Sequence, residues 1–160
     1  GRAMSITIRP FRPADLQVMQ EITLASFPGI SLDQTIEQKF GEQNGHDWRW
    51  HKARHIELET NANPVGAFIA EEGGRTVAYV TTTLDRAAGS GRIANLAVVA
   101  EMRGRGVGRQ LIEHALAWFR AEELSYALIE SMSHNEVGRG LYTSVGFQEI
   151  GQLVHYAMKL

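Results

Sequence analysis

The stretch "NLAVVAEMRGRGVGRQLI", residues 95–112, gives the clearest indication of the fold of this chain. It begins as an apolar run typical of a buried strand, passes through Gly104, Gly106 and Gly108 among three arginines, and ends in residues with helical spacing. The first N–H groups of a helix have no partner within the helix, and glycines leave the backbone before them uncovered. A strand, a glycine loop and a helix in this order therefore predict a site for an anion such as a phosphate.

Two well-known phosphate loops do not match this stretch. The dinucleotide fingerprint G-x-G-x-x-G starting at Gly104 requires a sixth-position glycine where Arg109 stands. A Walker loop requires Gly-Lys followed by Ser or Thr, whereas Gly108 is followed by Arg109 and Gln110. The residues alone also leave open a plain strand-to-helix turn with solvated arginines.

The composition of the 160 residues limits the class of protein. An apolar share of 44% suffices for one hydrophobic core, and no repeat or linker divides the sequence, so we expect a single domain over residues 4–160. The opening "GRA", residues 1–3, is expected to be a cloning remnant. A net charge of −2 does not favour nucleic acid or a membrane surface as a partner. No apolar run nears the roughly 20 residues of a membrane span and no signal-peptide pattern is present, so a cytoplasmic location is expected.

Metal and thiol chemistry are not indicated. The chain has no cysteine, which excludes disulfides, thiol nucleophiles and cysteine zinc sites. His51 and His55 are four residues apart, but Lys52 replaces the glutamate of H-E-x-x-H and no third ligand is evident. We therefore expect no metal, and interpret these histidines as part of a solvated helix face.

The predicted elements alternate between strands and helices. Alternating and helical spacing predict, in order, a strand at 5–12, a helix from 13 until "FPG" at 27–29, a less regular helical region at 33–60, a hairpin of 67–72 and 76–84 across Gly73 and Gly74, a strand at 92–99, a helix at 107–123, a strand at 126–132, a short helix between Asn135 and Gly146, and one or two strands at 147–160. This order predicts an α/β protein with a mixed sheet.

Two motifs extend this interpretation to a family. The loop satisfies R-x-x-G-x-G with Arg103, Gly106 and Gly108, and here the chain resembles the GNAT superfamily of acyl-CoA-dependent N-acyltransferases. The stretch "SHNEVGRGLYTSVGF", residues 133–147, is similar to the second signature of that family, with Gly138 where alanine is usual. The resemblance implies a central mixed sheet of six to seven strands flanked by about four helices.

The resemblance also implies an acetyl-CoA site. In this family a bulge opens one edge of the strand matching 92–99, the pantetheine arm pairs with that edge, and an N–H there, here that of Val98, faces the thioester oxygen. The loop would bind the pyrophosphate. The residues implied for the coenzyme are Leu96, Ala97, Val98, Arg103, Gly104, Arg105, Gly106, Val107, Gly108, Arg109, Asn135 and Tyr142.

Two residues are predicted to be catalytic. Glu130 is the single charge in "YALIESM", residues 126–132, and a carboxylate inside a buried strand is costly unless it is used. Its spacing to Asn135 and Tyr142 resembles that of the subgroup acetylating ribosomal-protein N-termini, where this glutamate is the base; a strand-end glutamate paired with Arg92 or Arg139 is the alternative. By the same resemblance Tyr142 would donate a proton to the leaving thiol, with a packing tyrosine as the alternative. Asn135 could be a helix cap only.

The predicted function is transfer of the acetyl group of acetyl-CoA to a primary amine by direct attack in a ternary complex. The acceptor would be a small-molecule amine, a protein N-terminus or a lysine, and the protein a monomer or homodimer. No motif in residues 24–60 identifies the acceptor. A non-catalytic acyl-CoA sensor on the same fold remains the alternative, although such a module would not need both Glu130 and Tyr142.

Overall fold

The computed structural model of the protein describes residues 5–26 and 31–160. The elements in chain order are β1 (Ile6–Pro10), α1 (Leu16–Ser26), α2 (Leu32–Phe40), α3 (Trp48–Ala62), β2 (Phe68–Glu72), β3 (Arg75–Asp85), β4 (Ser90–Val98), α4 (Val107–Ala121), β5 (Tyr126–Ile129) and α5 (Glu136–Val145). Short 3-10 turns precede α1, β2 and α4 at Pro13–Asp15, Pro64–Gly66 and Ala100–Met102. The expected cloning remnant, 1–3, and the helix-ending stretch, 27–29, lie outside the described residues.

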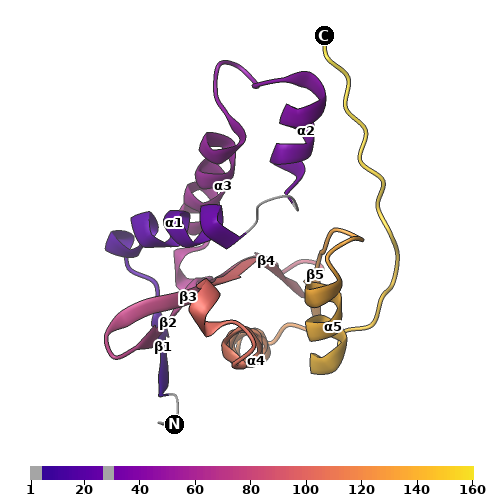
Figure 1. The fold of residues 1–160 in the computed structure, drawn as a ribbon. Coiled ribbons are helices and arrows are strands. Elements are labelled where there is room, and N and C mark those ends of the chain that lie inside the picture. The colour runs from indigo at the N-terminus through magenta and orange to yellow at the C-terminus, as the bar shows by residue number, and fades with distance from the viewer. Residues whose placement is uncertain (1–4, 27–30) are drawn as a thin grey trace.

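A mixed sheet forms the centre of the molecule. Across the described residues its five strands are ordered β1-β2-β3-β4-β5; β1 to β4 are antiparallel neighbours, and β5 runs parallel to β4. Helices α1, α2 and α3 lie on one side of the sheet, and α4 and α5 lie on the other (Figure 1). The predicted α/β class and the hairpin across Gly73 and Gly74 are confirmed.

Each face of the sheet has its own apolar core. The helical spacing noted after the glycine loop buries one face of α4 through Val107, Leu111, Ile112, Ala115 and Phe119, which pack with residues of β2, β3 and β4. The second core joins α1 and α3 to the opposite face through Met19, Ile22, Ile56, Ile69, Tyr79 and Ala97. Since β4 contributes to both cores, its position is fixed from both sides.

Three predictions about the elements are wrong. The sheet has five strands in the described part of the chain rather than six or seven, because residues 147–160 are extended but pair with no strand. Five α-helices are described rather than about four, because residues 41–47 divide the helical region at 33–60; the side chain of Asp47 caps the start of α3. Finally, β5 ends at Ile129 instead of 132.

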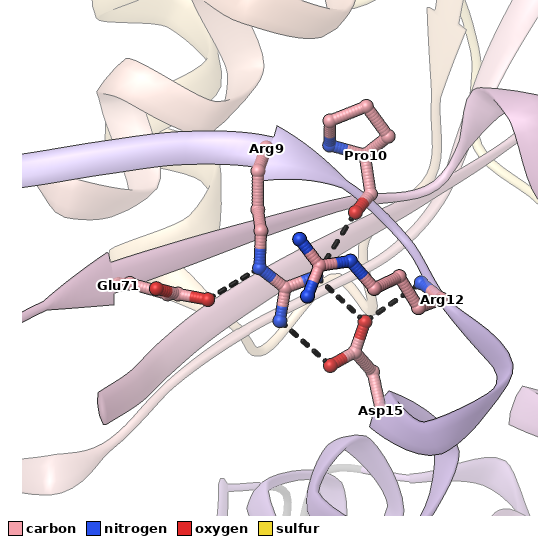
Figure 2. Close-up of polar contacts among 5 residues, drawn as sticks. All are labelled: Arg9, Pro10, Arg12, Asp15 and Glu71. Carbon is pink, nitrogen blue, oxygen red and sulfur yellow. Dashed lines mark hydrogen bonds and ion pairs between the residues drawn. The ribbon is translucent and has the colours of Figure 1, made fainter. Parts of the chain in front are cut away.

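A charged cluster fixes the start of α1 against the sheet (Figure 2). Arg9 on β1 donates to both carboxylate oxygens of Asp15, at 2.8 and 2.7 Å, and also hydrogen-bonds Glu71 on β2. The backbone N–H of Arg12 donates to Asp15 at 2.7 Å, and Asp15 is buried. The hydrogen bonds from Arg9 lower the pKa of the Asp15 carboxyl.

We expect Arg9→Met to lower the free energy of unfolding by about 2–4 kcal/mol at pH 7, because it leaves a buried carboxylate without its charged partner. The contribution of Asp15 is present above its unfolded pKa of about 3.9 and is lost as the pH falls through its lower folded pKa. The difference between variant and wild type should therefore shrink below about pH 4. Urea unfolding measures both values. Arg49→Met, which removes an exposed ion pair with Asp47, is the control, and an equal loss there would contradict the prediction.

Candidate functional site

An irregularity in β4 opens one edge of the sheet. The register between β3 and β4 shifts between Thr81 and Thr82, so that Ala94 is an extra residue in β4. On the other side, β5 pairs with β4 only over residues 90–93. From the bulge to Val98, β4 therefore has β3 on one side and, in the described chain, no strand on the other. The bulge and the opened edge implied by the resemblance are confirmed.

The direction of the backbone groups shows which residues face this edge. The N–H of Val99 donates to the carbonyl of Val77 on the β3 side at 2.9 Å. Because successive residues of a strand point their N–H groups to opposite sides, the N–H groups of Leu96 and Val98 point to the opened edge. The N–H group of Ala97 points to β3, and the side chain of Ala97 is buried in the second core. The structure thus brings Leu96 and Val98 to the edge, but not Ala97.

The glycine loop lies directly beyond the opened edge. Gly106 is the N-cap residue of α4, with φ at +81°, and no side chain caps this helix start. A Cβ built on Gly104 or Gly106 would meet no atom within 4 Å, so the space over the loop backbone is open. Arg103 and Arg105 are exposed beside it. Uncovered N–H groups with exposed guanidinium groups fit the pyrophosphate of a coenzyme.

Gly108 and Arg109 have different surroundings. A Cβ on Gly108 would lie 3.5–3.8 Å from side chains of Leu141, Leu96 and Val98, so this glycine faces the place where α4, α5 and the opened edge meet. Arg109 pairs with Glu113 at 3.0 Å and donates to the Ser144 hydroxyl on α5 at 3.2 Å. Its guanidinium therefore joins α4 to α5. Arg103 donates through Nε to the Val98 carbonyl at 3.3 Å, and the guanidinium groups of Arg103 and Arg105 remain exposed beside the loop.

The start of α5 brings three residues of the second signature together. Asn135 is the N-cap of α5, and its side-chain oxygen accepts a hydrogen bond from the Gly138 N–H at 3.1 Å. A Cβ on Gly138 would lie 2.7 Å from the Asn135 amide nitrogen and 3.3 Å from the Tyr142 hydroxyl. Glycine in place of the usual alanine thus leaves room for both groups. Burial raises the pKa of Tyr142, so its phenol stays protonated at neutral pH.

Glu130 is not inside a buried strand, contrary to the argument from its sequence. It directly follows β5, one residue beyond the last pair of the two strands, Ile93 with Ile129, where β4 and β5 part. Its side chain is 72% exposed and pairs with Arg92 of β4 at 2.5 Å. The pairing is the alternative named for Glu130, and its predicted burial is wrong because β5 is the edge strand of the sheet and none of its four residues is fully buried. The position at the parting of the strands is nevertheless suited to a group that meets substrate.

A polar cluster next to the bulge was missed by the sequence analysis. Glu59 on α3 accepts hydrogen bonds from the Asn95 amide at 2.6 and 2.8 Å and from the Thr81 hydroxyl at 2.9 Å. Lys52, on the same helix, donates to Asn95 at 3.4 Å, and burial lowers its pKa. The lone pairs of Glu59 are thus engaged in fixing the bulge. The sequence contained no signal for this contact, because helix and strand are far apart along the chain.

The two histidines of α3 contact residues outside their helix rather than solvent alone. His51 hydrogen-bonds the carbonyl of Gln43 at 3.0 Å, and His55 pairs with Asp33 of α2 at 3.4 Å. Asp33 raises the pKa of His55, which favours its charged form. In the parts of the chain that the structure describes, no three His, Asp or Glu side chains gather as a metal site would require.

Comparison with known families agrees with this geometry. The model of the acetyltransferase (GNAT) family matches residues 19–147, from α1 through the end of α5. The chain belongs to this family. This family is described as one of acetyltransferases.

Individual relatives are similar at lower identity. An N-acetyltransferase of Methanocaldococcus jannaschii is 31% identical over 90 residues, 56% of this chain; the match also covers 56% of that relative, so the chain spans about half its length. The aminoglycoside N-acetyltransferase AAC(6')-Iy, solved with CoA, has a TM-score of 0.69 at 16% identity over 99% of this chain and 98% of its own. The ribosomal-protein-S18-alanine N-acetyltransferase of Escherichia coli has 0.64 at 18%, over 92% and 80%. In the described residues no helix is long and apolar enough to cross a membrane.

Proposed function

We propose that this protein transfers the acetyl group of acetyl-CoA to a primary amine. The observation that carries the proposal is the continuity of two features: the edge of β4 opened by the bulge leads directly into the uncapped start of α4. A long thioester with a diphosphate needs both an extended partner for its arm and an anion site at a fixed distance along it. A phosphate site alone would not need the opened strand.

Each part of the site has a distinct role in binding the coenzyme. The N–H groups of Leu96 and Val98 are placed to pair with the amides of the pantetheine arm, as a further strand would. The loop around Gly106 would hold the pyrophosphate, with Arg103 and Arg105 as its charged partners. The fold of the CoA-bound AAC(6')-Iy structure supports this assignment at the level of the fold.

The proposed chemistry requires a base and an acid. A lysine-like amine with a pKa near 10.4 is almost wholly protonated at pH 7, so the attacking nitrogen must first lose a proton. We propose that Glu130, which lies where β4 and β5 part, accepts this proton. The N–H group of Val98 would stabilise the oxyanion. Tyr142, protonated at neutral pH, would then supply a proton to the departing thiolate.

The acceptor is proposed as a small-molecule amine or a protein amine. Two structural neighbours differ in this respect: one is named for aminoglycosides, and the other for an alanine of ribosomal protein S18. A panel of amines of both kinds, incubated with acetyl-CoA and followed by release of free thiol, tests the proposed reaction.

A binding module without catalysis is the second candidate, and one observation favours it. The exposed carboxylate of Glu130 is paired with Arg92, as a purely structural glutamate would be. Tight coenzyme binding without acetylation of any amine in the panel would support the module and contradict the enzyme.

Coenzyme A is expected to raise the melting temperature, and above its Kd the rise should grow with the logarithm of its concentration, because a ligand of the native state stabilises it by mass action. The shift should decrease with added salt, since the phosphates would meet exposed arginines. NAD and ATP should raise the melting temperature clearly less. Differential scanning fluorimetry at two salt concentrations measures these shifts, and an equal shift with NAD would overturn the acyl-CoA assignment.

A further inference from the structure

The bulge in β4 changes the side of the sheet to which the residues of this strand point. Ile93, before the bulge, packs in the core with α4, whereas Ala97 packs in the second core with α1 and α3, on the other side of the sheet (Figure 1). In a regular strand two residues four positions apart share one face. The extra residue, Ala94, therefore turns the following part of β4 over, and Asn95 faces α3.

The direction of the backbone N–H groups depends on the same register. The observed register pairs Thr81 of β3 with Asn95, and the N–H groups of Leu96 and Val98 point to the opened edge. A slip by one residue would remove the bulge and pair Thr81 with Ala94. The N–H groups of Leu96 and Val98 would then point to β3. The bulge thus decides whether the opened edge offers these two groups to a ligand.

One face of α3 holds the two residues of β3 between which the register shifts. Glu59 accepts a hydrogen bond from the Thr81 hydroxyl at 2.9 Å. Asn63, four residues later and the C-cap of the same helix, donates to the carbonyl and to the hydroxyl oxygen of Thr82, each at 3.1 Å. Both threonines are buried. Strand β3 is therefore attached to α3 on both sides of the register shift.

Glu59 also holds β4, and the slipped register would break this contact. Its two carboxylate oxygens accept from the Asn95 amide at 2.6 and 2.8 Å, and Lys52 donates to the oxygen of the same amide at 3.4 Å. After a slip, Ala94 would take this place and would offer the carboxylate no donor. The Asn95 amide would turn towards the apolar core with α4, where burial of an unpaired polar group is costly. Glu59 thus favours the register that contains the bulge.

We propose that Glu59 is a positioning residue, which sets the register of β4 and thereby directs the N–H groups of Leu96 and Val98 to the coenzyme. The role towards the coenzyme rests on the proposed function, whereas the effect on the register does not. Glu59 acts through Asn95 and Thr81, because both of its oxygens are engaged by these two side chains. Only the pantetheine arm, which would pair with the opened edge, then depends on Glu59. The pyrophosphate at the glycine loop does not.

Two ligands separate the arm from the phosphates. Glu59→Leu should weaken binding of coenzyme A by about tenfold or more, because the arm loses its two backbone partners. Binding of 3′-phospho-ADP, which is the coenzyme without its pantetheine arm, should stay unchanged. Glu59→Gln should restore the affinity for coenzyme A, since its amide oxygen still accepts from Asn95. Asn95→Ala removes the same contact from the side of β4 and should reproduce the effect of Glu59→Leu. Isothermal titration calorimetry with both ligands measures these affinities.

The control for a general loosening of α3 is Asp47→Ala. It removes the side-chain cap at the other end of this helix and should lower the melting temperature, but it should not change the ratio of the two affinities. Three results would overturn the proposal: unchanged binding of coenzyme A by Glu59→Leu, an equal loss of affinity for both ligands, or the same change of ratio in Asp47→Ala.

Amide hydrogen exchange, followed by NMR, tests the register without any ligand. In the wild type the N–H of Ala97, which points to β3, should exchange more slowly than those of Leu96 and Val98. In Glu59→Leu this difference should shrink by about tenfold or more, and in Asp47→Ala it should persist. An undiminished difference in Glu59→Leu would show that Glu59 does not set the register. A wild type that binds neither ligand would contradict the proposed function, and the exchange rates would still decide the role of Glu59 in the register.

Discussion

Gly106→Val is expected to abolish binding of coenzyme A while leaving the fold intact. The backbone N–H groups at the start of α4 lie under open space, and a branched side chain at 106 would fill that space. Charge-assisted hydrogen bonds contribute about 1.5–3 kcal/mol each, so losing two of them should weaken binding by about a hundredfold or more. Isothermal titration calorimetry with coenzyme A measures the change.

The backbone strain of this substitution requires its own control. Gly106 has φ at +81°, a conformation that L-residues other than Asn and Asp rarely adopt, and valine there should also lower stability by about 1–3 kcal/mol. Gly74→Val in the β2–β3 hairpin has the same strain, with φ at +80° and no atom within 4 Å of the added Cβ, but is not part of the glycine loop. Normal coenzyme binding by Gly106→Val, or equal loss in Gly74→Val, would show that the loop is not the pyrophosphate site.

The glycine loop could be predicted because its information is local. Strand, loop and helix follow one another within residues 95–112, and the apolar spacing after Val107 specifies the buried face of α4 without reference to any other segment. The same holds for the cap at Asn135, whose partner is three residues away. At these sites sequence and structure agree in detail.

The features that were not predicted depend on partners distant in the chain. The contact of Glu59 with Asn95 joins a helix and a strand 36 residues apart in the chain. The N–H group of Ala97 points away from the opened edge because of the register between β4 and β3. The burial assigned to Glu130 required β5 to be covered on both sides, whereas β5 is the edge strand of the sheet and none of its residues is fully buried. For residues 147–160 the predicted strands are absent, because an extended stretch becomes part of a sheet only where another strand lies alongside it.

The second large change that we expect is a loss of kcat when the proposed base or the proposed acid is replaced. Glu130→Gln should keep the shape of the site and most of the affinity for the coenzyme, but lower kcat by roughly 10²–10⁴ at neutral pH. The loss should shrink as the pH rises towards the pKa of the amine, because the acceptor then loses its proton to solvent. Steady-state rates between pH 6 and pH 10, on an amine identified from the panel, measure this dependence.

Two further variants separate the proton acceptor from a general effect of charge. Glu122→Gln also removes a carboxylate paired with an arginine, Arg86, but lies at the end of α4 and should leave kcat unchanged at every pH. Tyr142→Phe should lower kcat without recovery at high pH, because the leaving thiolate still lacks its donor when the amine is already neutral. Since the two groups act on one proton path, the loss in the double variant should be smaller than the product of the single losses. An unchanged rate for Glu130→Gln across the pH range would remove Glu130 from the mechanism, because the Arg92 pair would then be its whole role.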